Sequence, residues 1–281
     1  MSAGGLPTPP ALPPHPTRDL RPSGLRSALL DAGAWIVARV PLRVVDVMAW
    51  ALAWAWWTVL PVRKRVAVAN LRAALPEAPP RTTLVRMLHD LVLSYAELLQ
   101  FDRLDLRVEG AEGLAGAIVL AGHGSAWDVV LCAAGESFPT SIFLRTPKDR
   151  WVQAWLARLR DAHGVGRLET GATMADAYAA LAAGRNVLFI QDQRHNAGPP
   201  LPFFGRPART SLGAAVAARK TGRPIYGMWQ WREGVGRHVI RLRRLDLAGD
   251  PEAVTTALNG WYAEQIRSAP SGWLWLHDRW K

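Results

Sequence analysis

The sequence predicts an α/β fold in which a mostly parallel sheet is flanked by helices. From Ala117 onward, short apolar runs typical of strands alternate with longer segments typical of helices. The chain has 281 residues, of which 49% are hydrophobic, so it suits one α/β domain with appendages and a sizeable core. Its one cysteine, Cys132, lies in an apolar run and is expected to be buried, which excludes an intrachain disulfide framework and a multi-cysteine zinc site.

Residues 1–23 are dominated by proline, with serine, threonine and arginine and no apolar run. This composition predicts a disordered tail. A secretory signal is not expected, because the apolar region begins too late and no small-residue cleavage site follows it.

Residues 24–62 are rich in apolar side chains and contain a cluster of tryptophans. Their cleanest apolar run, 47–62, is shorter than the ~20 residues that a spanning helix needs. The basic triplet Arg63-Lys64-Arg65 closes it, as expected beside an anionic cytoplasmic leaflet. We therefore predict a membrane-associated helical segment that lies in the interface or spans the bilayer once, with a buried core helix as the alternative.

Residues 63–281 are predicted to form the α/β domain itself. Helices are expected over 63–75 and 81–104, with prolines between them. After the strand that starts at Ala117, the pattern predicts helices at 126–138, 149–163, 173–183, 210–221 and 251–268, and strands at 140–145, 186–192, 224–231 and 238–245.

The first strand ends in Gly122-His123-Gly124, and Asp128 follows in the first turn of the next helix. Five residues along an unbroken helix lie about 140° apart, but Gly124 permits a turn that folds the imidazole back onto the carboxylate. We expect His123 to act as a general base held by Asp128, the alternative being a structural histidine at a strand end. Ser125 is not expected to be a nucleophile, because its surroundings lack the G-x-S-x-G pattern.

Asp192 ends a second predicted strand. Active sites of parallel sheets lie at the carboxyl ends of the strands, so His123 and Asp192 are expected at one edge of the sheet. No metal site is predicted around His195, because no second ligand stands at a metal-binding spacing.

The loop 191–210 connects the strand that ends at Asp192 to the next predicted helix. It is rich in proline and glycine and is long enough to suggest a binding role. Phe203 and Phe204 stand beside Arg206 and Arg209. We expect them to offer a lipid with a phosphate an apolar surface next to cations, the alternative being an ordinary exposed loop.

The net charge of +11 and the pI near 10.9 indicate an anionic partner, which could be acidic lipid, acidic protein or nucleic acid. The 14 tryptophans favour a membrane interface. Nucleic acid is the weaker interpretation, because the sequence has no RNP aromatic pattern, zinc-finger spacing or P-loop.

Several segments together resemble the late acyltransferases of lipid A biosynthesis, the lauroyl/myristoyl type, within the wider group that shares a histidine-x4-acid motif. The resemblance is carried by 65–76 (RVAVANLRAALP), Glu97, 122–128 (GHGSAWD), 160–164 (RDAHG), Asp192-Gln193, 201–205 (LPFFG) and 273–281 (WLWLHDRWK). The chain departs from the family in its Pro-rich start and at Asp128, where many lipid A enzymes have glutamate. The second departure leaves the acyl acceptor open.

The resemblance implies a glycerolipid-acyltransferase-like fold at the cytoplasmic face of the inner membrane. It implies transfer of a fatty acyl chain, without a cofactor, from acyl carrier protein or acyl-CoA to a hydroxyl of a phosphorylated glycolipid, a lipid A precursor. Other acceptors remain open: a phosphatidylinositol mannoside, an aminolipid or a lysophospholipid. A membrane scaffold with a decayed site is a further alternative.

The same resemblance suggests roles for single residues. His123 would take the proton of the acceptor hydroxyl, with Asp128 stabilising the ring. Arg160, aided by backbone N–H groups at the Gly124–Ser125 helix start, would stabilise the oxyanion. Asp192, followed by Gln193, would shape the site or bind the acceptor.

Overall fold

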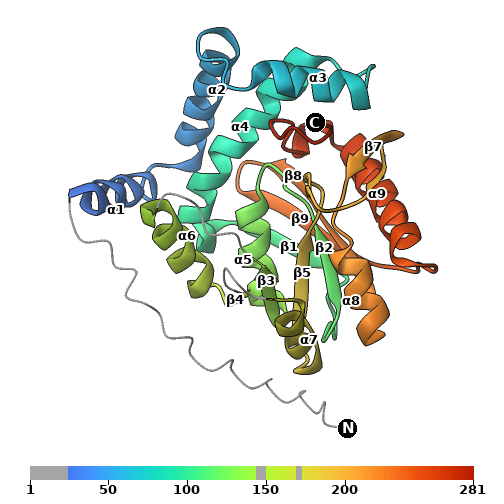
Figure 1. Ribbon diagram of the computed structural model, residues 1–281. Helices are drawn as coiled ribbons and strands as arrows, with labels where there is room; N and C mark the ends of the chain where they lie inside the picture. Colours follow the sequence, from blue (N-terminus) through green and yellow to red (C-terminus); the bar gives the residue numbers. More distant parts are fainter. Residues whose placement is uncertain (1–24, 144–149, 169–172) are drawn as a thin grey trace.

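A seven-stranded sheet forms the centre of the protein (Figure 1). The computed structural model describes residues 25–143, 150–168 and 173–281, so the predicted tail lies outside the described residues. The strand order is β1-β9-β8-β2-β5-β3-β4, and every neighbouring pair is parallel except β8 and β9. The strands are β1 (Asp105–Glu109), β2 (Ile118–Ala121), β3 (Thr140–Phe143), β4 (Val165–Leu168), β5 (Asn186–Ile190), β8 (Ile225–Gly234) and β9 (Arg237–Leu245). The α/β class with a mostly parallel sheet is confirmed.

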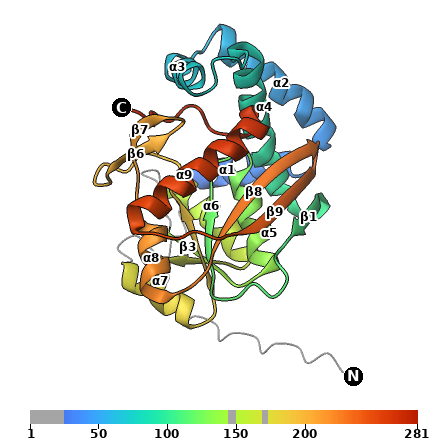
Figure 2. The same cartoon turned by 90° about the vertical axis from the view of Figure 1, so that its right-hand side faces the viewer.

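Helices cover both faces of the sheet (Figures 1 and 2). Side chains alternate along a strand, so Ile118 and Leu120 of β2 pack in a core with α7, α8 and α9, whereas Val119 and Ala121 pack in a second core with α5 and α6. In the described chain the helices are α1 (Leu25–Val37), α2 (Leu42–Thr58), α3 (Lys64–Ala74), α4 (Pro80–Leu99), α5 (Trp127–Ser137), α6 (Arg150–Ala162), α7 (Met174–Ala182), α8 (Gly213–Thr221) and α9 (Pro251–Ser268). Cys132 of α5 is buried, as predicted, and burial raises its pKa to about 12.

Two strands of this sheet, β1 and β4, were not predicted, and both are edges of the sheet. The burial of β1 alternates between exposed and half-buried residues, and its sequence, DLRVE, has no apolar run. Edge strands carry charged residues, so their sequences lack the apolar run that identifies a central strand. The predicted strand over 140–145 is β3, and its last two residues lie outside the described residues.

The tryptophan-rich segment forms two helices, separated at Pro41. Helix α2 packs on α4 through the buried Ala49, Ala53 and Trp56. Its other residues are half-buried or exposed, so α2 is not the buried core helix that was the alternative. Large apolar side chains elsewhere on these helices are exposed; they include Leu29, Trp35, Ile36, Val44, Val47, Met48, Leu52 and Trp54. Within the described ranges, no helix combines the length and the apolar character needed to cross a membrane.

Candidate active site

His123 and Asp192 meet at the carboxyl ends of two adjacent parallel strands, β2 and β5. The His123 Nδ1 lies 2.7 Å from Asp192 Oδ1, and the backbone N–H of His123 donates to Asp192 Oδ2 at 2.8 Å. Asp192 therefore holds both the ring and the backbone of His123. The carboxylate is fully buried, whereas 24% of the histidine side chain is exposed.

The charges of this pair support each other. Burial by itself would raise the pKa of Asp192, but the neighbouring His123 and the hydrogen bonds to the carboxylate lower it. Burial also opposes a charge on the ring, but the Asp192 carboxylate outweighs it and raises the pKa of His123. With Nδ1–H donating to Asp192, the lone pair of a neutral ring is on Nε2, which has no hydrogen-bond partner among the described residues.

Asp128 does not hold the ring, so that prediction is wrong. Arg160 of α6 donates from Nε and Nη2 to Asp128 Oδ1, at 2.8 and 2.6 Å. Asp128 lies inside the first turn of α5 and pairs with α6, whereas His123 turns toward the end of β5. Burial raises the pKa of Asp128, against the opposing charge of Arg160. The Trp127 ring lies between the two pairs, 5.8 Å from the His123 ring and 4.8 Å from the Arg160 guanidinium.

The donors expected for an oxyanion are engaged in other bonds. Arg160 is buried and bonded to Asp128. The Gly124 N–H donates to Gly122 O at 2.8 Å, and the Ser125 N–H donates to Gly272 O at 2.9 Å. The first N–H groups of α5, which have no intrahelical partner, are donors that the sequence did not single out.

The first phenylalanine of the Phe-Phe segment is part of the core rather than of an exposed lipid surface. Residues 200–209 form the hairpin of β6 (Pro200–Phe203) and β7 (Arg206–Arg209). Phe203 is buried against Trp273 and Trp280, so the prediction of an exposed Phe203 is wrong.

Phe204, Arg206 and Arg209 remain at least partly exposed on this hairpin. Phe204 occupies its turn at φ 52. The Arg206 guanidinium lies 5.2 Å from the Trp280 ring, and the Arg209 Nη1 donates to backbone carbonyls of the preceding loop. The hairpin therefore keeps cations at its surface but contributes its first phenylalanine to the core.

The remaining predicted residues add little to the pair. Gln193 is half-buried and makes no side-chain hydrogen bond within the described structure, and His195 is exposed. No three potential metal ligands gather anywhere in the described part of the chain.

The family described as bacterial lipid A biosynthesis acyltransferase matches residues 20–281. The chain belongs to this family. The resemblance seen in the sequence segments is thereby confirmed.

Among curated proteins, this family member is similar to phosphatidylinositol mannoside acyltransferases. It is 34% identical to that of Mycobacterium tuberculosis over 84 residues, which are 30% of this chain and 27% of that protein. It is 33% identical to that of Mycolicibacterium smegmatis over 84 residues, which are 30% of this chain and 28% of that protein. The match thus spans little more than a quarter of the length of these relatives.

The closing segment of this lipid A acyltransferase family member, residues 273–281, secures the His123 turn. The fully buried Trp273 donates from Nε1 to Asp192 Oδ2 at 2.7 Å, and its backbone pairs with Gly124. The Leu274 N–H donates to His123 O at 3.0 Å. Sequence reasoning noted this segment only as a family mark, because no spacing pattern shows that it reaches Asp192.

A second buried network surrounds Glu97. Glu97 of α4 is fully buried and accepts hydrogen bonds from Arg232, the Gly236 N–H and His238 Nε2. His238 Nδ1 in turn bonds to the Gln230 amide at 2.7 Å. Despite burial, these partners lower the pKa of Glu97 to about 2. The network therefore joins α4 to the β8–β9 pair.

Proposed function

We propose that this protein transfers a fatty acyl chain from a thioester donor, acyl carrier protein or acyl-CoA, to a hydroxyl of a membrane lipid. The observation that carries the proposal is the His123–Asp192 pair, in which Asp192 binds Nδ1 and leaves Nε2 as the basic nitrogen of a partly exposed histidine. A base held in this way suits proton abstraction from an alcohol.

His123 Nε2 accepts the proton of the acceptor hydroxyl while the oxygen attacks the thioester carbonyl. Asp192 stabilises the imidazolium that forms, which agrees with its raising the pKa of His123. Collapse of the tetrahedral intermediate expels the thiolate, which recovers the proton from the imidazolium. No acyl-enzyme is formed in this scheme.

The tetrahedral intermediate needs donors for its oxyanion. Because Arg160 and the Gly124–Ser125 N–H groups are engaged, we assign this role to the first N–H groups of α5, aided by the positive end of the helix dipole. Arg160 then acts indirectly, by holding Asp128 and so the start of α5.

The acceptor we propose is a phosphorylated glycolipid. Membership of the family supports a lipid A precursor. The similarity to phosphatidylinositol mannoside acyltransferases supports the second candidate, a phosphatidylinositol mannoside. Purified protein with labelled donor and each acceptor in turn discriminates the two, since only the true acceptor accumulates an added acyl chain by mass spectrometry.

We further propose that the protein acts at the cytoplasmic face of the inner membrane. The support is the apolar surface of α1 and α2, which continues into exposed Val59, Leu60 and Val62 and then into Arg63-Lys64-Arg65. Apolar side chains followed by cations fit an anionic lipid interface.

The decisive experiment is His123→Ala, assayed for acyl transfer beside His195→Ala as the control histidine. Loss of the base should lower the rate by ~10²–10⁴, whereas the exposed His195 should be dispensable. If His123→Ala transfers acyl chains at the normal rate and is folded by circular dichroism, the proposal is wrong.

A further inference from the structure

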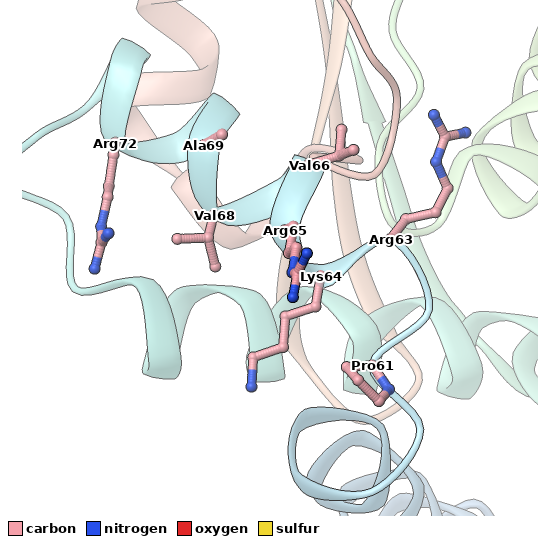
Figure 3. Close-up of a pocket in the computed structure, with 8 residues that line it drawn as sticks. All are labelled: Pro61, Arg63, Lys64, Arg65, Val66, Val68, Ala69 and Arg72. Atoms are coloured by element: carbon pink, nitrogen blue, oxygen red, sulfur yellow. The ribbon is translucent and has the colours of Figure 1, made fainter.

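A groove of about 610 Å³ lies along α3, apart from the His123–Asp192 pair. Its lining includes four cationic side chains, Arg63, Lys64, Arg65 and Arg72, and apolar residues such as Val68 and Ala69 (Figure 3). Arg65, Val68 and Arg72, at spacings of three, four and seven positions, extend from the same side of the helix, and Lys64 extends toward that side as well. The groove therefore combines apolar walls with a concentration of positive charge.

Most of this charge is uncompensated. Lys64 donates to Trp57 O at 2.7 Å and lies over the Trp57 ring. Arg63, Arg65 and Arg72 are exposed, and none of them forms an ion pair with a carboxylate of the described residues. Unpaired arginines beside an apolar wall match an amphiphile that carries a phosphate, because the guanidinium binds phosphate in a bidentate manner.

Helix α3 is attached to the same segment that secures the active site. The buried Asn70 donates from Nδ2 to Trp275 O at 3.0 Å and to His277 O at 2.6 Å. His277 Nε2 accepts from the Arg194 N–H at 3.0 Å, just beyond Asp192. Burial chiefly lowers the pKa of His277, and the charges of His123 and Arg63 add to this effect. A ligand on α3 is thus held at a fixed position relative to His123.

The groove also continues the surface that we assign to the membrane. Val59, Leu60 and Val62 are 72%, 66% and 69% exposed and lead directly into Arg63. Apolar side chains inserted among acyl chains would place the following cations at the depth of lipid phosphates. This continuity favours a lipid over a soluble protein as the occupant.

We propose that the α3 groove binds the phosphate of the lipid acceptor, with Arg65 and Arg72 as its main ligands, and so presents the acceptor hydroxyl to His123. The proposal rests on the proposed function and names a binding site for its acceptor class. Arg63 extends away from the other three cations in Figure 3, and its charge helps to lower the pKa of His277.

The test is equilibrium binding of monomeric dihexanoyl phosphatidylinositol to the full chain, with phosphate-free dihexanoylglycerol as the comparison probe. The double variant Arg65→Gln/Arg72→Gln should bind the phosphate probe at least about tenfold more weakly, the equivalent of about 1.4 kcal/mol, because it loses the charge-assisted bonds to the phosphate. Its binding of dihexanoylglycerol should not change. Arg219→Gln, an exposed arginine of a separate groove near α8, is the matched control and should behave as wild type.

Kinetics separate the acceptor from other anions. The KM for a phosphorylated acceptor in neutral detergent should rise about tenfold with little change in kcat. Unchanged binding of the probe overturns the proposal. So does an effect seen only with anionic vesicles, which would indicate bulk lipid, or only on the KM of a carrier-borne donor, which would indicate a carrier protein.

Failure of the proposed function has a different signature. The binding experiment needs no turnover, so it reports on the groove even if His123→Ala retains full activity. Conversely, loss of activity in His123→Ala with undiminished probe binding in the double variant would leave the function standing and remove the groove.

Discussion

At the scale of single residues, the partner of His123, the proposed base, is a strand-end neighbour rather than the acid of the histidine-x4-acid motif. Asp192 bonds to the His123 ring, and Asp128 bonds to Arg160. Both acids are buried, but only Asp192 makes a direct hydrogen bond to the ring of His123 and raises its pKa through that bond. The two acids should therefore respond differently to substitution.

Asp192→Asn tests this difference. Removal of the carboxylate removes the interaction that raises the pKa of His123, so the acid limb of the kcat/KM profile should move to lower pH. An amide that donates to Nδ1 also favours the tautomer with its proton on Nε2, so the rate should fall by ~10²–10⁴. The control is Asp128→Asn, which should lower activity and move the acid limb less, because Asp128 raises the pKa of His123 only through its charge and makes no hydrogen bond to the ring. If the acid limb of the kcat/KM profile moved in Asp128→Asn but not in Asp192→Asn, Asp128 would be the partner of the ring after all.

Trp273 is a positioning residue for Asp192. Trp273→Phe keeps an aromatic ring in the core but deletes the N–H that donates to Asp192 Oδ2. We expect kcat to fall roughly tenfold, the equivalent of one net hydrogen bond of about 1.4 kcal/mol, with KM unchanged. Trp275→Phe is the control, since its buried indole N–H donates to Pro270 O rather than to the site. Equal effects of both substitutions on kcat would reduce Trp273 to a packing role.

At the scale of elements, the sequence was most informative for strands buried on both faces and for long helices. The strands β2 and β5 were found from their apolar runs, and helix α9 lies at the predicted bounds. The edge strands β1 and β4 and the β6–β7 hairpin were missed, because their residues are polar or rich in proline. Local patterns detect burial, and these elements are only partly buried.

The same limit explains the outcome at the site. His123 and Asp192 were placed correctly at strand ends, but their partnership depends on β2 and β5 being neighbours, which no local pattern reveals. The short spacing between His123 and Asp128 suggested a contact that the start of α5 at Trp127 prevents. Pairing across a sheet is information about topology, and it became visible only with the strand order.

The attachment of α4 to β8 and β9 depends on Glu97. Glu97→Gln leaves Arg232 with less compensation in the interior, and breaking such a buried pair costs about 3–5 kcal/mol of unfolding free energy. Urea unfolding at neutral pH measures this loss. Arg241→Gln, which breaks an exposed pair with Glu109, is the control and should cost less than about 1 kcal/mol. A similar small loss for Glu97→Gln would show that the network does not hold these elements together.

The same residue predicts a pH dependence of stability. The folded-state pKa of Glu97, about 2, lies below its ordinary value of 4.5. Its contribution is therefore fully present above pH 4.5 and is lost as the pH falls from 4.5 toward 2. Urea unfolding of the wild type and of Glu97→Gln should converge over this window. If their difference stays constant down to pH 2, Glu97 is not the titrating group.

At the scale of the whole molecule, three features continue into one another. The apolar surface of α1 and α2 leads through residues 59–62 to the basic groove of α3, and α3 is bonded to the C-terminal segment that holds Asp192. Figure 1 shows α2, α3 and the C-terminus gathered at one end of the molecule. This arrangement is the one that the proposed function requires, because it gives the proposed lipid acceptor a path from the proposed membrane surface to His123.

We predict that the protein attaches to a membrane through this end of the molecule. Leu60→Ser/Val62→Ser should weaken sedimentation with anionic vesicles by tenfold or more, because the two side chains bury apolar surface with a transfer free energy of roughly 1.5–3 kcal/mol each. The Val62 carbonyl, which accepts from Trp56 Nε1, is retained, so the turn after α2 should keep its structure.

The control variant is Val216→Ser. It removes an exposed apolar side chain from α8, away from this end, and should bind vesicles as the wild type does. High salt should also weaken the binding of the wild-type protein to anionic vesicles, because it screens the attraction between the cations of α3 and the lipid charges. Equal sedimentation of both variants would mean that residues 59–62 do not enter the interface and that the lipid reaches His123 by another route.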